Sequence, residues 1–337
     1  MKAKSDEIYM GLDIGYSNVS ARIGNGETSR DIIFPAGAAH KRHAPQLATG
    51  GGASDVFEVV VDDDPWVAGL EPDRLGKVER QLHRDYPKSS NYLALFYAAL
   101  AASGETKIDV LTTGLPVDQF KDIEYRQALV NRLQGTHNVS PKLSIEVSKV
   151  VVVPQPAGAY MSLVNSNENE DIEDIVEIIL NGRMLVIDPG YFSTDWVLFD
   201  CGEVRFEDSD TSLHAMSTVI GGINDMIRQD YAVAPGPAKI EKAIRSGSNF
   251  VFASGQKVDI TEYREKSADE QAEEALTKVI VSLRASGENM DVVLMTGGGG
   301  ADFSKVTKQR FPNSKFVSPE NSVTSISDGF YYISVES

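Results

Sequence analysis

The sequence has little cysteine and no long apolar run. Its 337 residues include one cysteine, Cys201, so an intrachain disulfide is excluded and a reducing compartment is favoured. No stretch of about 18 consecutive apolar residues occurs, which predicts that no helix spans a membrane. The N-terminal residues also lack the apolar segment of a signal peptide. We therefore expect a cytoplasmic protein that does not act at a membrane.

Basic residues are also in short supply. The chain has 32 Lys and Arg against 49 Asp and Glu, which gives a formal net charge of -17. An acidic surface repels phosphodiester backbones, so we do not expect direct nucleic-acid binding, although the protein could act on DNA through a basic adaptor. Simple solubility explains the charge equally well. The five histidines show no metal-ligand spacing.

The rest of the composition is that of a folded protein. Hydrophobic residues make up 42% and charged residues 24%, and 337 residues are enough for two lobes. Strand-like and helix-like stretches alternate, which predicts a mixed α/β fold. A polar, acidic stretch at 165–174 is the predicted lobe boundary, because the strand pattern begins again after it.

The expected elements are short. A helix over about 93–102 is predicted to follow Ser89 or Ser90, which are suitable N-cap residues, and residues 35–55 are predicted to form a loop. The expected strands are 8–13, 18–23, 30–34, 57–61, 66–68, 108–113, 143–153, 184–188, 194–199, 203–207 and 292–295. The other expected helices are 123–133, 213–231, 238–246, 262–285 and 326–333.

One pattern occurs twice. Asp13 and Gly15 end an apolar strand, and Ser17 and Asn18 lead into the next strand. In the second half, Asp188 and Gly190 end an apolar strand, and Ser193 and Thr194 lead into the following one. Two copies about half a chain apart indicate two lobes with the same core.

Such a turn suits a phosphate ligand. Glycine lets the backbone approach a ligand closely, and successive N–H groups can surround phosphate oxygens. The aspartate before it can hold Mg²⁺, which bridges phosphates. A single Asp-X-Gly is weak evidence because these residues are common in turns, but a matched pair in the same strand–turn–strand setting is far more specific.

Two further segments add to this pattern. The strand 292–295 runs into Gly297, Gly298, Gly299 and Gly300, whose backbone can lie against a base or a phosphate at a helix start. The strand 143–153 ends at Gln155, which stands between two prolines. A glutamine there can orient a water for attack on a γ-phosphate, or it can cap the following helix.

The order of these motifs resembles the actin-like ATPases, and most closely the ParM/StbA group of plasmid-segregation proteins. The resemblance is carried by segments that match two phosphate loops, two connecting segments and an adenosine loop. These segments are 13–18, 188–195, 154–160, 327–331 and 297–300, together with Leu115-Pro116-Val117.

The resemblance implies an actin-like ATPase fold of the α/β class, with two RNase-H-like lobes and a nucleotide cleft between them. Lobe I is then expected at 1–165, with a small insertion at about 36–86. Lobe II is expected at 166–325, with a helical insertion at about 213–288. A C-terminal helix at 326–337 would return to lobe I.

The resemblance also implies roles for individual residues. Asp13 and Asp188 would bind Mg²⁺, and Gln155 and Asp188 would act in hydrolysis of ATP or GTP. Glu241 is a candidate for a ribose contact, although a side chain on a solvated helix face is the favoured interpretation of its sequence. The expected nucleotide-binding residues are Asp13, Gly15, Ser17, Asn18, Gly190, Ser193, Thr194, Glu241, Gly297, Gly298 and Gly299.

The sequence departs from its relatives in places. Many of them carry a lysine in the strand after the first loop, where this chain has Ser20. Arg22 lies two residues on, along the same strand face, and is a possible substitute. Tyr191 and Phe192 stand where the second loop usually carries glycines, although the StbA group tolerates this.

Three functions fit these motifs. The first is a filament-forming ATPase that associates with itself and segregates plasmid DNA through a small adaptor bound to a centromere-like site, as the resemblance implies. The second is a small-molecule kinase of the sugar kinase and acetate kinase superfamily, which needs a base aimed at a substrate hydroxyl; no such motif is evident. The third is a chaperone-like ATPase, which normally carries a peptide-binding domain after the nucleotide domain.

Overall fold

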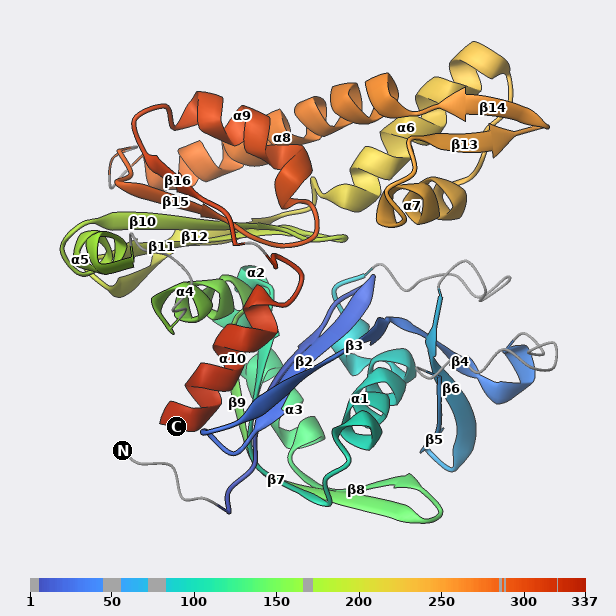
Figure 1. Cartoon of the computed structure of the whole chain (residues 1–337), viewed down its shortest axis with the longest axis vertical. Coiled ribbons are helices and arrows are strands. Elements are labelled where there is room, and N and C mark those ends of the chain that lie inside the picture. The colour runs from blue at the N-terminus through green and yellow to red at the C-terminus, as the bar shows by residue number, and fades with distance from the viewer. Residues whose placement is uncertain are drawn as a thin grey trace. The chain divides into compact units, whose positions relative to one another are not determined.

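The computed structural model describes residues 6–44, 56–71, 83–165, 172–284, 287, 289–319 and 321–337 (Figure 1). The chain divides into two compact units, which we call unit 1 (1–169 with 323–337) and unit 2 (170–322). Within the described ranges, no helix is long and apolar enough to cross a membrane.

Unit 1 is built on a mixed sheet with the strand order β3-β2-β1-β7-β9-β8. The strands β1, β7 and β9 are parallel, and β2, β3 and β8 run antiparallel to their neighbours. Their bounds are β1 Tyr9–Ile14, β2 Asn18–Gly24, β3 Ser29–Pro35, β7 Lys107–Leu115, β8 Gly135–Ser140 and β9 Leu143–Pro154. The strand β8 was not expected from the sequence.

Helices cover this sheet and form the core of unit 1 with it. The N-cap of α1 is Ser89, whose side chain accepts a hydrogen bond from the Tyr92 N–H, as the sequence predicts. Gly104 ends this helix in the left-handed conformation, with φ of 69°. The bounds are α1 Ser90–Ser103, α2 Val117–Lys121, α3 Ile123–Leu133, α4 Gln155–Asn165 and α10 Ser325–Glu336.

A small sheet lies between β3 and α1 in the chain. It has the order β4-β6-β5, with bounds β4 Gly37–His40, β5 Phe57–Val61 and β6 Asp64–Leu70. The sheet packs on α1, where the Asn91 side-chain amide donates to the Ala38 carbonyl at 2.8 Å. The expectation of a loop throughout 35–55 is therefore wrong at β4, where the small residues pair with β6; residues 45–55 lie outside the described part.

The sheet of unit 2 has the strand order β12-β11-β10-β15-β16. Its directions match those of β3-β2-β1-β7-β9 strand for strand. Its bounds are β10 Arg183–Pro189, β11 Thr194–Asp200, β12 Glu203–Ser212, β15 Val292–Met295 and β16 Lys315–Val317. Two sheets of one topology confirm the internal repeat that the sequence predicts, although β16 was not expected.

The helices of unit 2 include an insertion between β12 and α8. In this insertion, the hairpin β13–β14 follows α6 and α7 (Figure 1). The bounds are α5 Ile172–Asn181, α6 Met216–Tyr231, α7 Pro237–Arg245, β13 Phe250–Ala253, β14 Gln256–Asp259, α8 Thr261–Leu283 and α9 Gly300–Arg310. The helix expected at 213–231 begins only at Met216, because Ser212 still pairs with Thr194 in the sheet.

Glycines bring α10 into close contact with the rest of unit 1. A Cβ atom on Gly329 would overlap the Gly158 carbonyl of α4, and one on Gly158 would collide with the Ile326 carbonyl of α10. A Cβ on Gly11 of β1 would overlap the Ser327 carbonyl. The C-terminal helix is thus packed backbone to backbone against α4 and β1.

We expect Gly329→Ala to destabilise the protein by about 1–3 kcal/mol, because the added methyl group has no room beside Gly158. The matched control is Gly221→Ala in α6, where an added Cβ would meet nothing within 4 Å. Urea unfolding of both variants measures the difference. Equal midpoints for Gly329→Ala and the wild type would show that α10 tolerates a wider spacing.

Candidate functional site

The two Asp-Gly turns close with the same hydrogen bond. In the first turn, between β1 and β2, the Gly15 N–H donates to the Asn18 carbonyl at 3.0 Å. In the second, between β10 and β11, the Gly190 N–H donates to the Ser193 carbonyl at 2.8 Å. A Cβ on either glycine would stand only 3.0 Å from the accepting oxygen, so both positions favour glycine.

In the first turn, the structure brings Asp13 and Gln155 together. Gln155 begins α4 directly after β9, and its side-chain amide donates to the Asp13 carboxylate at 3.1 Å. The Gln155 side chain therefore reaches across to β1. Burial raises the pKa of Asp13 from 3.8 to about 6, and the hydrogen bond from Gln155 opposes this rise.

In the second turn, buried hydroxyl groups bond within unit 2. Ser193 donates to the Asp195 carboxylate at 2.7 Å, and Thr211 donates to the other oxygen of the same carboxylate. The Thr194 hydroxyl donates to the His214 carbonyl at 2.7 Å. Asp195 lies directly opposite Asp188 across the β10–β11 pair, so two buried acidic side chains share one face.

The glycine run lies against the end of β10. A Cβ on Gly297, whose φ is 72°, would overlap the Asp188 carboxylate. The Gly299 N–H donates to the Pro189 carbonyl at 2.8 Å, and a Cβ there would press on that carbonyl. Gly298, by contrast, faces open space. Unit 2 thus brings Asp188 and Gly190 close to the glycine run 297–300, because β10 and β15 are neighbouring parallel strands that end at the same edge of the sheet.

A pocket of about 390 Å³ opens beside the start of α9. Its lining includes Ala301 and Asp302, which directly follow the glycine run, and Ser248, Asn249, Thr261 and Arg264. The Arg264 guanidinium makes two hydrogen bonds to the Asp302 carboxylate, at 2.7 and 2.9 Å. This pairing holds the planar guanidinium in one orientation at the pocket wall.

Glu241 differs from its expected environment. It lies on α7 and is only 6% exposed, so the interpretation as a solvated helix face is wrong. The alternation of charged and apolar residues around it predicts an exposed side chain, but the helix turns Glu241 and Ile240 to the inside together. Glu241 and Gly297–Gly299 are not among the residues that line the pocket.

Arg22 is held away from the first turn. Its guanidinium lies 3.4 Å from Asp328 of α10 and 3.9 Å from Asp31, and its Nε donates to Ser29. The Ser20 side chain is buried, and its hydroxyl lies 3.4 Å from the Val323 carbonyl. The two acidic side chains, one of them on the C-terminal helix, hold the Arg22 guanidinium. The structure therefore does not support the idea that Arg22 replaces the missing lysine.

Sequence reasoning missed two sets of residues near these turns. Arg264 and Asp302 come from different helices, and no local motif joins them. Tyr16 lies in the first turn and stacks on Tyr86, with ring centroids 4.3 Å apart, but 70 residues separate the two. The only signal was the position of Tyr16 beside Gly15 and of Asp302 two residues after Gly300.

The pKa of Asp13 predicts a specific pH dependence. A raised folded-state pKa means that the folded state binds the proton more tightly, so stability falls as the pH rises from about 4 to 6. Without nucleotide, Asp13→Asn should therefore be more stable than the wild type by about 3 kcal/mol at neutral pH. Below pH 4 this difference should shrink.

Urea unfolding at several pH values tests this, with the exposed Asp6→Asn as the matched control. A constant difference between Asp13→Asn and wild type from pH 4 to 7 would contradict the assignment.

Two family models match the chain in succession. "Actin like proteins N terminal domain" matches residues 11–158, which lie in unit 1. "Archaeal actin homologue MreB-like, C-terminal" matches residues 186–308, which lie in unit 2. No curated protein sequence matches the chain.

Solved structures share the fold over almost the whole chain. The archaeal actin homologue Ta0583 has a TM-score of 0.74 at 18% identity, with 97% of this chain and 99% of that chain covered. A ParM filament from Clostridium botulinum has a TM-score of 0.74 at 18% identity, with 98% and 99% covered. A non-polymerisable pCBH ParM mutant has a TM-score of 0.75 at 18% identity, with 98% and 100% covered.

Because the sequence identities are low, these structures establish the fold of the chain and nothing beyond it. The family models cover each repeated half separately, and the two sheets have one topology. These findings confirm the resemblance that the sequence motifs carry: both halves of the chain match models of actin-like domains, and the fold is actin-like.

Proposed function

We propose that this protein binds a nucleoside triphosphate with Mg²⁺, hydrolyses it, and uses the nucleotide to control its assembly into filaments. The observation that carries the proposal is the pair of Asp-Gly turns, each closed by the same glycine N–H to carbonyl bond. Each turn offers backbone N–H groups and a strand-end carboxylate of the kind that binds phosphate and its metal. The Ta0583 complex with ADP supports nucleotide binding in this family.

The phosphate contacts follow from the turns. Gly15 and Gly190 keep the backbone close to the ligand, and Ser17 and Asn18 supply polar groups at the first turn. The hydroxyls of Ser193 and Thr194 already donate to Asp195 and to the His214 carbonyl, so these two residues would serve the phosphate through their backbone. Asp13 and Asp188 are hard oxygen donors at the ends of β1 and β10. Mg²⁺ commonly takes one or two carboxylates and completes its shell with water and phosphate oxygens, so this donor set fits the metal. When bound, the metal would neutralise phosphate charge.

Gln155 is the residue we assign to the attacking water. Its side-chain nitrogen donates to Asp13, which leaves the side-chain oxygen to accept a hydrogen bond from water. The water oxygen would attack the γ-phosphorus and the bond to the bridging oxygen would break. The proton of the water would pass to an oxygen of the released phosphate, and the products would be a nucleoside diphosphate and phosphate. The role of Gln155 is to orient the water, as an amide cannot accept its proton.

The pocket beside α9 is the part of unit 2 that best fits the nucleoside. Its volume is in the range of small-molecule sites, and it begins where the glycine run ends. The fixed guanidinium of Arg264 offers a flat, positively charged surface on which a base can stack. The lining of this pocket begins only at Ala301, so Gly297, Gly298 and Gly299 and the buried Glu241 would support the nucleoside site from beside the pocket and would not contact the nucleoside within it.

Self-association and a role in plasmid segregation complete the proposal. The ParM filament of Clostridium botulinum supports assembly into filaments. A small DNA-binding adaptor on a centromere-like site would connect such a filament to plasmid DNA, since the acidic chain is poorly suited to bind DNA itself. A small-molecule kinase is the alternative, and the first experiment below separates the two.

High-speed sedimentation with ATP, GTP, ADP, a non-hydrolysable analogue or no nucleotide, each with Mg²⁺, tests the main proposal. We expect a triphosphate to send the wild type into the pellet and phosphate to be released. Asp188→Asn should stay soluble and lose at least about 100-fold in hydrolysis, because it keeps the shape but not the charge of a metal ligand. Asp6→Asn is the matched control at an exposed aspartate.

If the wild type binds nucleotide but never pellets, the filament proposal fails for the isolated protein, and a screen of hydroxyl and carboxylate substrates becomes the test of a kinase.

The pocket assignment has its own test. Ala301 is exposed at the start of α9, so Ala301→Phe should fill the pocket without breaking the Arg264–Asp302 pair. We expect nucleotide affinity to fall at least about tenfold through the lost nucleobase contacts, while inorganic triphosphate binds as before. Ala238→Phe, at an exposed position of α7, is the control. Equal losses for nucleotide and inorganic triphosphate would refute a nucleoside pocket here.

A further inference from the structure

Two tyrosines clamp the first Asp-Gly turn to the segment that precedes α1. Tyr16 follows Gly15 in the turn, and Tyr86 is 7% exposed and lies three residues before the N-cap Ser89. Their rings stack with centroids 4.3 Å apart and planes 23° apart. Tyr86 also meets the buried Tyr92 of α1 edge to face, at 5.5 Å. The turn therefore rests on an aromatic support from outside the β1–β2 hairpin.

The hydroxyl groups of the pair reach in opposite directions. The Tyr16 hydroxyl donates to the His83 carbonyl at 3.0 Å, in the segment that carries Tyr86. The Tyr86 hydroxyl lies 3.4 Å from the Gly15 carbonyl, in the turn that carries Tyr16. Each tyrosine thus stacks on the other ring, and its hydroxyl reaches a backbone carbonyl of the other tyrosine's segment. A displacement of one segment therefore displaces the other.

The equivalent carbonyl of the second turn is bound differently. The Gly190 carbonyl accepts the Met216 N–H at 3.1 Å, and the Tyr191 carbonyl accepts the Ser217 N–H at 2.8 Å. Both donors are backbone groups at the start of α6. The Gly190 carbonyl is therefore bound by a helix backbone, whereas the Gly15 carbonyl faces a side-chain hydroxyl, that of Tyr86. A backbone bond also reaches the first turn, since the Ser17 carbonyl accepts the Ala36 N–H at 3.0 Å, but the contact at Gly15 is one that a side-chain substitution can remove.

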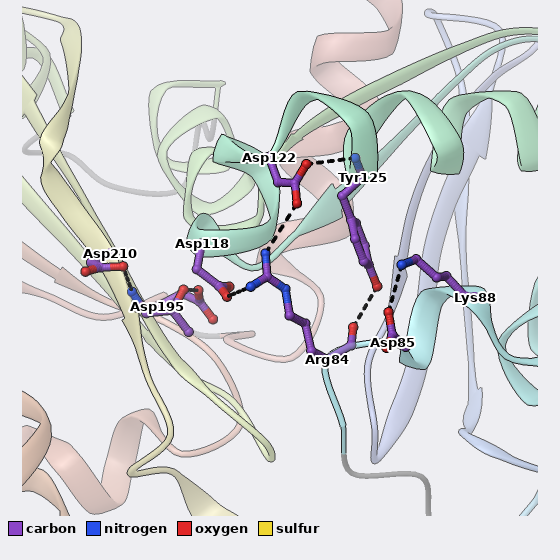
Figure 2. A network of polar contacts seen from close by, with 9 residues as sticks. Arg84, Asp85, Lys88, Asp118, Asp122, Tyr125, Asp195 and Asp210 are labelled. Carbon is purple, nitrogen blue, oxygen red and sulfur yellow. Dashed lines mark hydrogen bonds and ion pairs between the residues drawn. The ribbon is translucent and has the colours of Figure 1, made fainter.

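The segment 83–89 is itself held firmly within unit 1. Arg84 bridges Asp118 at 3.7 Å and Asp122 at 3.6 Å, and its carbonyl accepts the Tyr125 hydroxyl at 2.6 Å (Figure 2). Arg132 donates to the carbonyls of Pro87 and Ser89, at 2.7 and 2.9 Å. The clamp thus connects the turn to α2 and α3 as well as to α1.

We propose that Tyr16 and Tyr86 are positioning residues that hold the first turn in its phosphate-binding conformation and transmit a change in that turn to residues 83–89 and the start of α1. The role in phosphate binding rests on the proposed function, but the effect on the turn does not. Neither residue takes part in the chemistry. The ligand is the phosphate chain of the nucleotide, and the pair sets how well the turn is prepared for it.

Hydrogen exchange without nucleotide tests the first half of this inference. The Gly15 amide is protected by its bond to Asn18, so Tyr86→Leu should speed its exchange about tenfold when the stacking partner is lost. Tyr86→Phe keeps the ring and should stay within about threefold of the wild type. Tyr97→Leu is the matched control, because this half-buried ring of α1 packs on Phe96 and His137 instead.

Binding of a non-hydrolysable triphosphate tests the second half. Tyr86→Leu should bind the triphosphate about tenfold more weakly than Tyr97→Leu does. Binding should also slow hydrogen exchange over residues 83–92 in the wild type, and this slowing should be absent in Tyr86→Leu. Equal exchange at Gly15 in Tyr86→Leu and Tyr97→Leu overturns the inference. A wild type that binds no nucleotide overturns the proposed function and with it the phosphate role, whereas exchange at Gly15 still decides whether the pair positions the turn.

Discussion

The hydrogen bond that closes each Asp-Gly turn is the constraint on which the rest of the site depends. It brings the carbonyl of Asn18 or Ser193 to 3.0 Å from where a glycine Cβ would stand, so the third residue of the motif must be small. The closed turn also fixes the register of the hairpin, which pairs Asp13 with Ser20 and Asp188 with Asp195. The aspartate thereby lies at the turn, as the last residue but one of its strand. Asp188 is buried at this position and Asp13 is half-buried.

Much of the fold was predictable because its signals are local. The strand 57–61, the helix 123–133 and the strand 292–295 occupy the expected residues, and the repeat of the two turns indicated that two sheets share one topology. Apolar strands that end in Asp-X-Gly can be recognised in a single sequence, because the turn tolerates few alternatives. The actin-like fold follows from two such turns in the right order, as the family models confirm.

The parts that were missed depend on contacts between distant segments. The short strand β16 pairs with β15 only through the tertiary fold, and β8 has a weak pattern of its own. Glu241 is turned inward by the packing of α7, which the mixed charges of that helix do not indicate. Arg22 is bound by Asp328 from the far end of the chain. The stack of Tyr16 on Tyr86 and the pair of Arg264 with Asp302 likewise join residues with no common motif.

Three of these missed residues, Glu241, Tyr86 and Arg264, lie in or beside the insertions rather than in the repeated core. Between its third strand and the next helix, unit 1 carries the small sheet and the segment with Tyr86, and unit 2 carries α6, α7 and the β13–β14 hairpin. The core supplies two equivalent turns, and a symmetric pair alone would not distinguish one end of a nucleotide from the other. The insertions break that equivalence. Backbone amides of α6 bind the second turn, whereas the Tyr86 hydroxyl contacts the first. The pocket is lined by Ser248 and Asn249, which belong to the insertion of unit 2 and have no counterpart in unit 1. In the proposed nucleotide-binding role, the two ends of the nucleotide would be distinguished by the residues that the repeat does not share.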